Sequence, residues 1–164
     1  MRKGDVLMHR NYAKRVVVLG VILSSMFPLF GFGESILVST HYPGAKLFGK
    51  EVATLCESGI MDRLFGAGHL VFSTEVNEVA YHQDFEASSV RIAKNCGAQY
   101  LLEVRIDFAT TVADVNDPEK AVYRLYDVAG DHELSEGSFP FSESDEESLE
   151  TAGAGLASVV LERL

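Results

Sequence analysis

The chain divides near residue 33, and this division limits which part of it can fold. Five basic residues within the first fifteen positions precede an uncharged apolar run at residues 16–32. A basic leader, a short apolar run and small residues at its end form the layout of a secretory signal. Gly31 and Gly33 are the small residues that a signal peptidase would read. We therefore predict a signal peptide at residues 1–33, cleaved after Gly33, and a folded domain at residues 34–164.

The same apolar run also permits an uncleaved anchor. A stretch of about 17–18 apolar residues lies at the lower limit for spanning a bilayer. Because the run is short and ends in a cleavage-like pattern, we favour cleavage and a periplasmic protein exported through the Sec pathway. In the alternative, the uncleaved residues 16–33 anchor the protein in the inner membrane, and the expected membrane contact is limited to this segment.

The charge of the expected domain argues against nucleic-acid partners. Residues 34–164 keep nine of the fourteen Lys and Arg residues and twenty-three of the twenty-four acids, which gives a formal net charge of −14. Such a charge repels nucleic acid and anionic lipid headgroups, and no basic cluster follows the leader. We therefore expect a protein partner or self-association, and no nucleic acid.

The first half of the domain predicts alternating strands and helices. Apolar, β-branched runs at residues 35–40 and 70–74 indicate buried strands. Apolar residues recur at three- and four-residue steps at residues 47–64 and again at residues 83–96, which is the period of an amphipathic helix. The expected inward positions are Val52, Leu55, Cys56, Ile60 and Leu64 in the first helix and Phe85, Ile92, Ala93 and Cys96 in the second.

The second half predicts a meander and a closing helix. Residues 100–112 alternate apolar and charged side chains, as a strand does with one covered and one wet face. Strands at residues 121–128 and 134–141 complete an antiparallel meander, and Ser144 and Glu147 have the spacing of a capping box at the start of the last helix. The expected fold class is α/β (α+β): a single three-helix domain on a mixed five-stranded sheet, in the order βαβαββα.

The two cysteines, Cys56 and Cys96, both occupy positions of the predicted helices where a small apolar residue would pack inward. Free cysteine is among the most buried residue types, so we expect both to be buried and unpaired. A disulfide between them is the alternative in an oxidising compartment, if their α-carbons come within about 7 Å.

Three short phrases link the sequence to a known domain type. They are IAKNCGAQYLL at residues 92–102, YRLYDV at residues 123–128 and GSF at residues 137–139. In this pattern the chain resembles the bacterial envelope domains of the TolB N-terminal type, a group that includes the penicillin-binding-protein activator LpoB and the curli secretion protein CsgG. The resemblance covers most of residues 35–164 and implies a domain that docks on other envelope proteins without chemistry of its own. It does not extend to the β-propeller of TolB, the lipidated cysteine of LpoB or the pore-forming hairpins of CsgG, so it implies none of their activities.

The remaining motifs support no catalytic or metal site. His82 and Glu86 stand four residues apart, but a zinc site needs a third ligand. The acidic residues at 114–119 lack the Gly and Glu that an EF-hand requires at its sixth and twelfth positions. The glycines within residues 152–155 lack the Lys of a phosphate loop, and they predict close packing of the last helix on the sheet. We therefore expect no enzymatic activity, no cofactor and no metal.

Two histidines carry the alternative function. His41 and His69 flank predicted strand ends, where α/β sheets tend to hold ligands, and Asp62 or Asp84 would be their partners in acid-base chemistry. A structural role is the simpler interpretation because no nucleophile or metal accompanies them. The alternative is a small-ligand-binding or hydrolytic domain that uses the loops around His41 and His69.

The last strand is the leading candidate for a partner surface. It closes the meander and carries Pro140, which is tolerated at sheet edges. An edge strand can recruit an extended segment of a partner or a second copy, although Pro140 and Glu136 also suit an edge that is only protected against aggregation. The candidate partner or ligand residues are His41, His69, Ser138 and Phe139. The expected function is a non-enzymatic exported envelope protein that acts as a protein-interaction or accessory module.

Cleavage has a direct readout. Protein recovered from the periplasmic fraction should have the intact mass of a chain that begins at Glu34, because the small residues Gly31 and Gly33 define the site. A full-length species that stays with the inner membrane after salt washing would instead establish the anchor.

Overall fold

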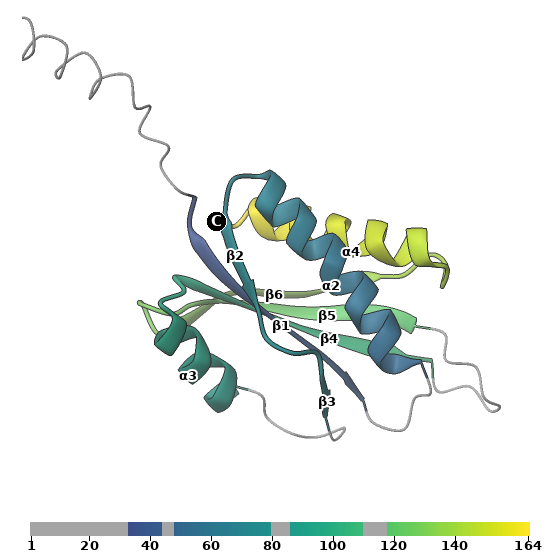
Figure 1. Cartoon of the computed structure of the whole chain (residues 1–164), viewed down its shortest axis with the longest axis horizontal. Coiled ribbons are helices and arrows are strands. Elements are labelled where there is room, and N and C mark those ends of the chain that lie inside the picture. Colours follow the sequence, from purple (N-terminus) through teal and green to yellow (C-terminus); the bar gives the residue numbers. More distant parts are fainter. Residues whose placement is uncertain (1–32, 44–47, 80–85, 110–117) are drawn as a thin grey trace, which may run out of the picture. The chain divides into compact units, whose positions relative to one another are not determined.

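The computed structural model describes residues 33–43, 48–79, 86–109 and 118–164. Its strands are β1 (Ser35–Pro43), β2 (Leu70–Ser73), β3 (Asn77–Val79), β4 (Tyr100–Phe108), β5 (Pro118–Asp127) and β6 (His132–Pro140). Its helices are α2 (Gly49–Gly66), α3 (Glu86–Cys96) and α4 (Glu146–Leu161) (Figure 1). The described part is therefore an α/β domain with three helices on a mixed sheet, as predicted.

The sheet combines parallel and antiparallel pairs. Its strand order is β2-β1-β4-β5-β6, and β3 also pairs with β1. The strand β1 runs parallel to β2, β3 and β4, whereas β4, β5 and β6 form an antiparallel meander. This confirms the expected switch from crossover connections to hairpins, and it leaves β6 at one edge of the described sheet.

The helices α2 and α4 cover one face of the sheet (Figure 1). From β4, Leu102, Val104 and Ile106 point into this core and are at most 1% exposed. Their alternation with charged residues follows the two-residue period of a strand. From α2, the predicted residues Val52, Cys56, Ile60 and Leu64 are buried, and Leu55 is half-buried against the same core.

The opposite face, which we call the open face, is covered only in part by the residues that the structure describes. Its apolar cluster is small: Leu37, Ala93, Ala98, Leu101 and Val128, with Phe72, Val90 and Tyr126 packed against it. The helix α3 lies over this cluster at one end of the sheet (Figure 1). Among the described residues, Tyr126 of β5 packs against this cluster, whereas no residue of β6 does.

The two helices of the main core meet backbone to backbone. A methyl group on Gly59 would collide with the carbonyl oxygen of Glu150, and one on Gly153 would collide with the carbonyl oxygen of Cys56. Only glycine permits this approach, because any Cβ would push the helices apart. We predicted that this glycine segment packs on the sheet; at Gly153 the prediction is wrong, because the residue packs on α2.

The second glycine of that segment does pack on the sheet. A Cβ on Gly155 would lie 2.6 Å from the ring of Phe139 in β6. The ring of Phe139 thus packs β6 against α4, and it fits there because Gly155 has no side chain.

The start of the described domain is fixed beside the loop between α2 and β2. Gly33 donates its N–H to the carbonyl oxygen of Gly68 at 3.0 Å, and Leu70 donates to Glu34 at 3.1 Å. Gly68 has a φ of 94°, a conformation that favours glycine. This turn therefore places β2 alongside the first residues of β1.

The five predicted strands are all present, and the observed order βαββαβββα adds the three-residue strand β3 to them. One local expectation, the start of the last helix, was wrong. The N-cap of α4 is Asp145, whose carboxylate accepts from the N–H of Ser148 at 3.0 Å, and not Ser144. The negative charges of Asp145 and the first turn suit the helix dipole at this end.

The helix α3 is rotated relative to the expected stripe. Ser89 and Ala93 are buried, whereas Ile92 is 42% exposed and Cys96 is exposed; the predicted Phe85 lies outside the described residues. The buried residues described in this helix are therefore small ones, Ser89 and Ala93. Cys56 and Cys96 are free and lie on α2 and α3, on opposite faces of the sheet.

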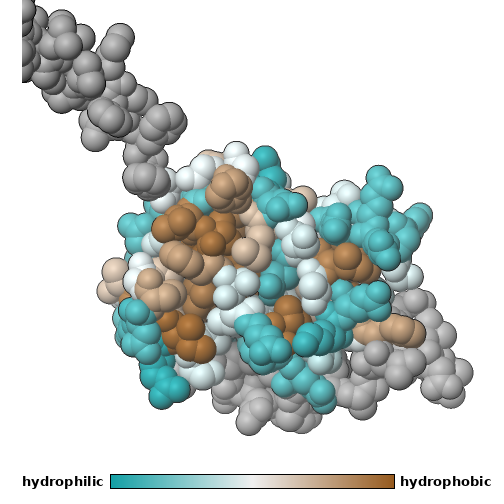
Figure 2. Space-filling model, viewed as in Figure 1, coloured by the Kyte–Doolittle hydropathy of each residue, from teal (hydrophilic) through white to brown (hydrophobic). Residues whose placement is uncertain are grey.

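On one face of the described domain, apolar and hydrophilic side chains gather in separate regions (Figure 2). Figure 2 shows apolar side chains gathered around β2 and hydrophilic ones where α4 begins. The exposed apolar residues include Phe65, 71% exposed, and Leu70, 47% exposed. Among the described residues, no helix is both long and apolar enough to cross a membrane.

The glycine contact can be tested by substitution. Gly153→Ala should lower the free energy of unfolding by about 1–3 kcal/mol, because the added methyl meets backbone that cannot rotate away. Gly66→Ala is the matched control, since nothing lies within 4 Å of its added methyl, and it should leave stability unchanged or raise it slightly. Urea unfolding measures both variants, and equal effects would contradict the proposed contact.

Candidate functional site

The strand register aligns side chains of the open face into rows across the sheet. The first row is Leu37, Leu101, Tyr126 and Glu133; the second is Ser39, Glu103, Arg124 and Glu136; the third is His41, Arg105, Val122 and Ser138. The first row belongs in part to the apolar cluster under α3. The polar character of the open face therefore begins where the cover of α3 ends.

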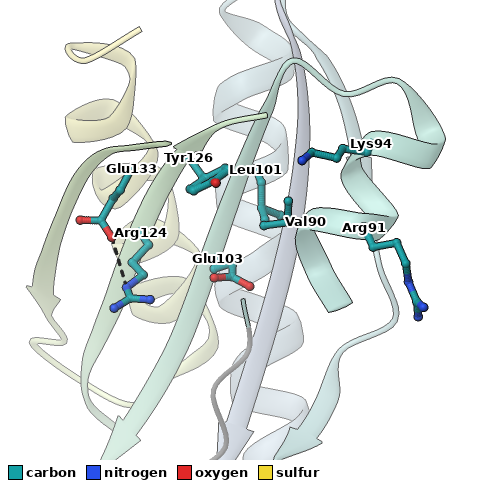
Figure 3. Close-up of a pocket in the computed structure, with 8 residues that line it drawn as sticks. All are labelled: Val90, Arg91, Lys94, Leu101, Glu103, Arg124, Tyr126 and Glu133. Atoms are coloured by element: carbon teal, nitrogen blue, oxygen red, sulfur yellow. Dashed lines mark ion pairs between the residues drawn. The ribbon is translucent and has the colours of Figure 1, made fainter. Parts of the chain in front are cut away.

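A pocket of about 470 Å³ lies at this boundary. Its apolar lining consists of Val90 from α3, Leu101 from β4 and Tyr126 from β5. Figure 3 shows Val90 beside Leu101. The volume falls within the range of ligand pockets, about 300–1,000 Å³, so the pocket can accept a large apolar side chain.

Charged side chains complete the lining: Arg91 and Lys94 from α3, Glu103 from β4, Arg124 from β5 and Glu133 from β6. In Figure 3, Arg91 is directed away from the other labelled side chains, whereas Lys94 extends toward Tyr126. Four elements thus surround an apolar floor with charges of both signs.

On the α3 side of the pocket, Lys94 is held by a carboxylate. Its Nζ lies 2.7 Å from Oδ1 of Asp131. This hydrogen bond raises the pKa of Lys94 and lowers the pKa of Asp131, so both groups stay charged. Asp131 itself has a φ of 56° in the turn between β5 and β6, and the ion pair therefore joins that turn to α3.

On the β6 side of the pocket, the guanidinium of Arg124 forms ion pairs with two carboxylates. Nε of Arg124 lies 3.5 Å from Glu133 and 3.9 Å from Glu136, and Glu103 faces Arg124 in the β4–β5 register. These exposed pairs contribute little to stability, since median surface pairs are worth about 0–1 kcal/mol. They leave this side of the pocket acidic.

The hydrogen-bond pattern defines which backbone groups of β6 face outward. Phe141 donates its N–H to Glu119 at 3.1 Å, and the register continues to the pair of Ala121 with Phe139. Because hydrogen-bonded and non-hydrogen-bonded pairs alternate in an antiparallel ladder, the N–H and C=O groups of Ser138 and Glu136 point away from β5. Within the described chain, β6 is therefore an unpaired edge at these two residues.

The two predicted surface residues of this strand differ in environment. Ser138 is exposed, whereas Phe139 is half-buried and packs under α4 against Gly155. Ser138 thus belongs to the outward edge, and Phe139 belongs to the packing that holds the edge in place.

His41 lies within β1, not on a loop after it, and is 6% exposed. Thr74 donates its hydroxyl hydrogen to Oγ of Ser39 at 3.2 Å, and this Oγ lies 3.0 Å from Nε2 of His41. Which of Ser39 and His41 donates in this second contact depends on the tautomer of the imidazole. Burial lowers the pKa of His41 to about 4, so the neutral imidazole is favoured near neutral pH.

His69 lies on the loop before β2 and donates its N–H to the carbonyl of Leu64 at 3.2 Å. The register places Leu70 opposite Ser35, at the other end of β1 from His41. Six residues of strand correspond to about 20 Å. The structure therefore does not bring His41 and His69 into one site; Asp62 is exposed, and Asp84 lies outside the described residues.

Two further titratable groups lie buried on α2, next to each other. Burial raises the pKa of the Cys56 thiol to about 12, so it stays protonated and is a poor nucleophile. Burial also raises the pKa of Glu57, which is 8% exposed, although the hydroxyls of Thr40 and Ser73 oppose the shift. The burial of Glu57 was not predictable from the sequence, because an acid in an amphipathic helix is normally exposed.

In the described part of the chain, no three His, Cys, Asp or Glu side chains are grouped as metal ligands. His82 and residues 114–117, which belong to the two metal-site motifs considered in the sequence, lie outside that part, whereas Glu119 lies in β5. The pocket was not predicted from the sequence. The only sequence feature that could have indicated it is the alternation of charged and apolar residues along β4 and β5.

Comparison with known proteins gives a general resemblance. No protein-family model matches the chain, and no curated protein matches it significantly. Among solved structures, a Leu-to-Met variant of the PelC dodecamer from Paraburkholderia phytofirmans is 16% identical, with a TM-score of 0.48, over 81% of this chain and 90% of that one.

Two other structures are similar at the same level. Lipoprotein GNA1162 from Neisseria meningitidis is 17% identical, with a TM-score of 0.45, over 79% of this chain and 99% of that one. TolB from Acinetobacter baumannii is 14% identical, with a TM-score of 0.43, over 80% of this chain but 28% of that one. At these values the resemblance is one of general architecture and does not extend to function.

The buried imidazole makes stability depend on pH. Because the pKa of His41 falls from 6.5 to about 4 on folding, the unfolded chain binds its proton first as the pH drops. The stabilising contribution is complete above pH 6.5 and should be lost as the pH falls through 4, by about 3 kcal/mol in total.

Urea unfolding between pH 7 and pH 4 tests this against His41→Gln, which removes the titrating group. The wild type should lose more stability than the variant across this window. Parallel curves for the two proteins would show that His41 does not titrate in the expected way.

Proposed function

We propose that the chain is an exported protein of the bacterial envelope whose domain binds another protein and catalyses no reaction. The observation that carries the proposal is the outward-facing backbone of Glu136 and Ser138 on β6, next to a pocket with an apolar floor. Backbone groups at a sheet edge provide affinity for an extended chain, and a neighbouring pocket provides specificity.

The histidine alternative has less support. A ligand or hydrolytic site built on both His41 and His69 would have to span the length of β1. His41 is also held neutral by burial, with a pKa of about 4, and this makes it a weak base near neutral pH. The binding role needs none of these groups.

The export part of the proposal comes from the basic leader and the apolar run at residues 16–32. The binding part is tested in cells with a photo-crosslinking amino acid. Placed at Ser138, on the outward edge, it should capture a protein in the envelope fraction. Placed at Thr151, which is exposed on α4, it should not.

Equal capture at Ser138 and Thr151 would mean nonspecific proximity and would contradict a binding edge on β6. An absence of capture at Ser138 together with a hydrolase activity lost in His41→Ala would support the alternative function instead.

A further inference from the structure

We propose that the occupant of the β6 edge is an extended segment of a partner protein that carries basic side chains opposite Glu133 and Glu136 and places one apolar side chain in the pocket beside α3. This rests on the proposed function and names the chemistry of the partner. The argument has three parts: the free backbone, the charge of the edge, and the position of the pocket.

The backbone of β6 can accept one more strand. Ser138 and Glu136 each direct an N–H and a C=O outward, two residues apart. This is the spacing at which an antiparallel neighbour exchanges pairs of hydrogen bonds. Pro140 offers only its carbonyl, so the added strand ends there. The length available is therefore that of a short peptide segment and not of a full strand.

The charge of this edge selects a basic segment. The strand β6 contains Glu133 and Glu136 and no Lys or Arg. Arg124 is shared between both carboxylates at 3.5 and 3.9 Å, so the edge keeps an excess of negative charge. Opposite charges across neighbouring strands are worth roughly 0.2–1 kcal/mol each, and the net charge of −14 over residues 34–164 steers basic partners toward the domain.

The pocket adds the apolar requirement. Glu133 belongs both to β6 and to the lining of the pocket, so a chain paired with the edge passes beside the pocket. The floor is formed by Val90, Leu101 and Tyr126, which favours an aliphatic or aromatic side chain. Because Lys94 on the far side is already paired with Asp131, the basic residues belong on the β6 side and not on the α3 side.

A second copy of the chain fits this edge less well. In an antiparallel pair of β6 strands centred on Gly137, Glu136 would lie opposite Ser138 of the copy, and each edge would bring its two carboxylates. Two domains that each carry a charge of −14 also repel each other. The charge therefore favours a basic partner.

The experiment uses a fluorescein-labelled peptide, Thr-Lys-Thr-Phe-Thr-Lys-Thr, whose Lys and Phe side chains share one face of a strand. Fluorescence anisotropy with the whole domain should show binding that is lost when both Lys are replaced by Glu and weakened when Phe is replaced by Ala. Methyl NMR signals of Val90 and Leu101 should shift with the Phe peptide and not with the Ala peptide.

Ser138→Pro removes one outward donor and should weaken binding about tenfold, the equivalent of one hydrogen bond, while Ser138→Ala keeps the donor and should bind like the wild type. N-methylation of alternate peptide amides removes hydrogen bonds from the other side without any effect on folding. It should weaken binding to a similar degree.

Binding that survives both Ser138→Pro and N-methylation would be general charge attraction and would overturn the proposal, as would an absence of binding. A wild-type dimer in sedimentation experiments that Ser138→Pro dissociates would identify a second copy as the occupant and would also overturn it. Photo-crosslinking at Ser138 separates the proposed function from this inference about the partner's chemistry. Capture of a protein at Ser138 would support the proposed function even when this peptide fails to bind.

Discussion

The contact of α2 with α4 through Gly59 and Gly153 determines how the two faces of the sheet are used. Because the two helices touch along their backbones, they form one continuous layer, and that layer covers the main core. The eleven-residue α3 remains for the other face, where it rests on small residues such as Ala93 and Ala98. The pocket and the uncovered rows follow from this unequal division of the helices.

Burial near the end of β1 favours the neutral form of both a base, His41, and an acid, Glu57. It lowers the pKa of His41 on the open face and raises the pKa of Glu57 on the helix-covered face. In both cases the neutral form is favoured, because charge is costly away from water. The polar groups at this end of the sheet, Ser39 and Thr40 included, are therefore better suited to hydrogen bonding within the fold than to proton transfer with a ligand.

Periodicity was sufficient to predict the main elements of the fold. The alternation along β4 and the helical step of Val52, Cys56, Ile60 and Leu64 produce strong patterns, because each buries a continuous face. The strand β3 was not predicted because its three residues are too few to show a pattern. The buried face of α3 was predicted wrongly because the helix buries small side chains such as Ser89, whereas the larger Ile92 is exposed. The candidate site depended on register, which brings Glu103, Arg124 and Glu136 into one row from three strands; no local motif contains that information.

The hydrogen bond between Gly33 and Gly68 involves the residue after which we propose that the leader is cleaved. In the folded domain, Gly33 is half-buried, and even a single Cβ there would come within 2.5 Å of the carbonyl oxygen of Gly68. Under the proposed cleavage after Gly33, a peptidase would need this residue extended in its own active site and would compete with the domain for the same stretch of backbone. The proposed cleavage would then act on a chain in which Gly33 has not yet paired with Gly68.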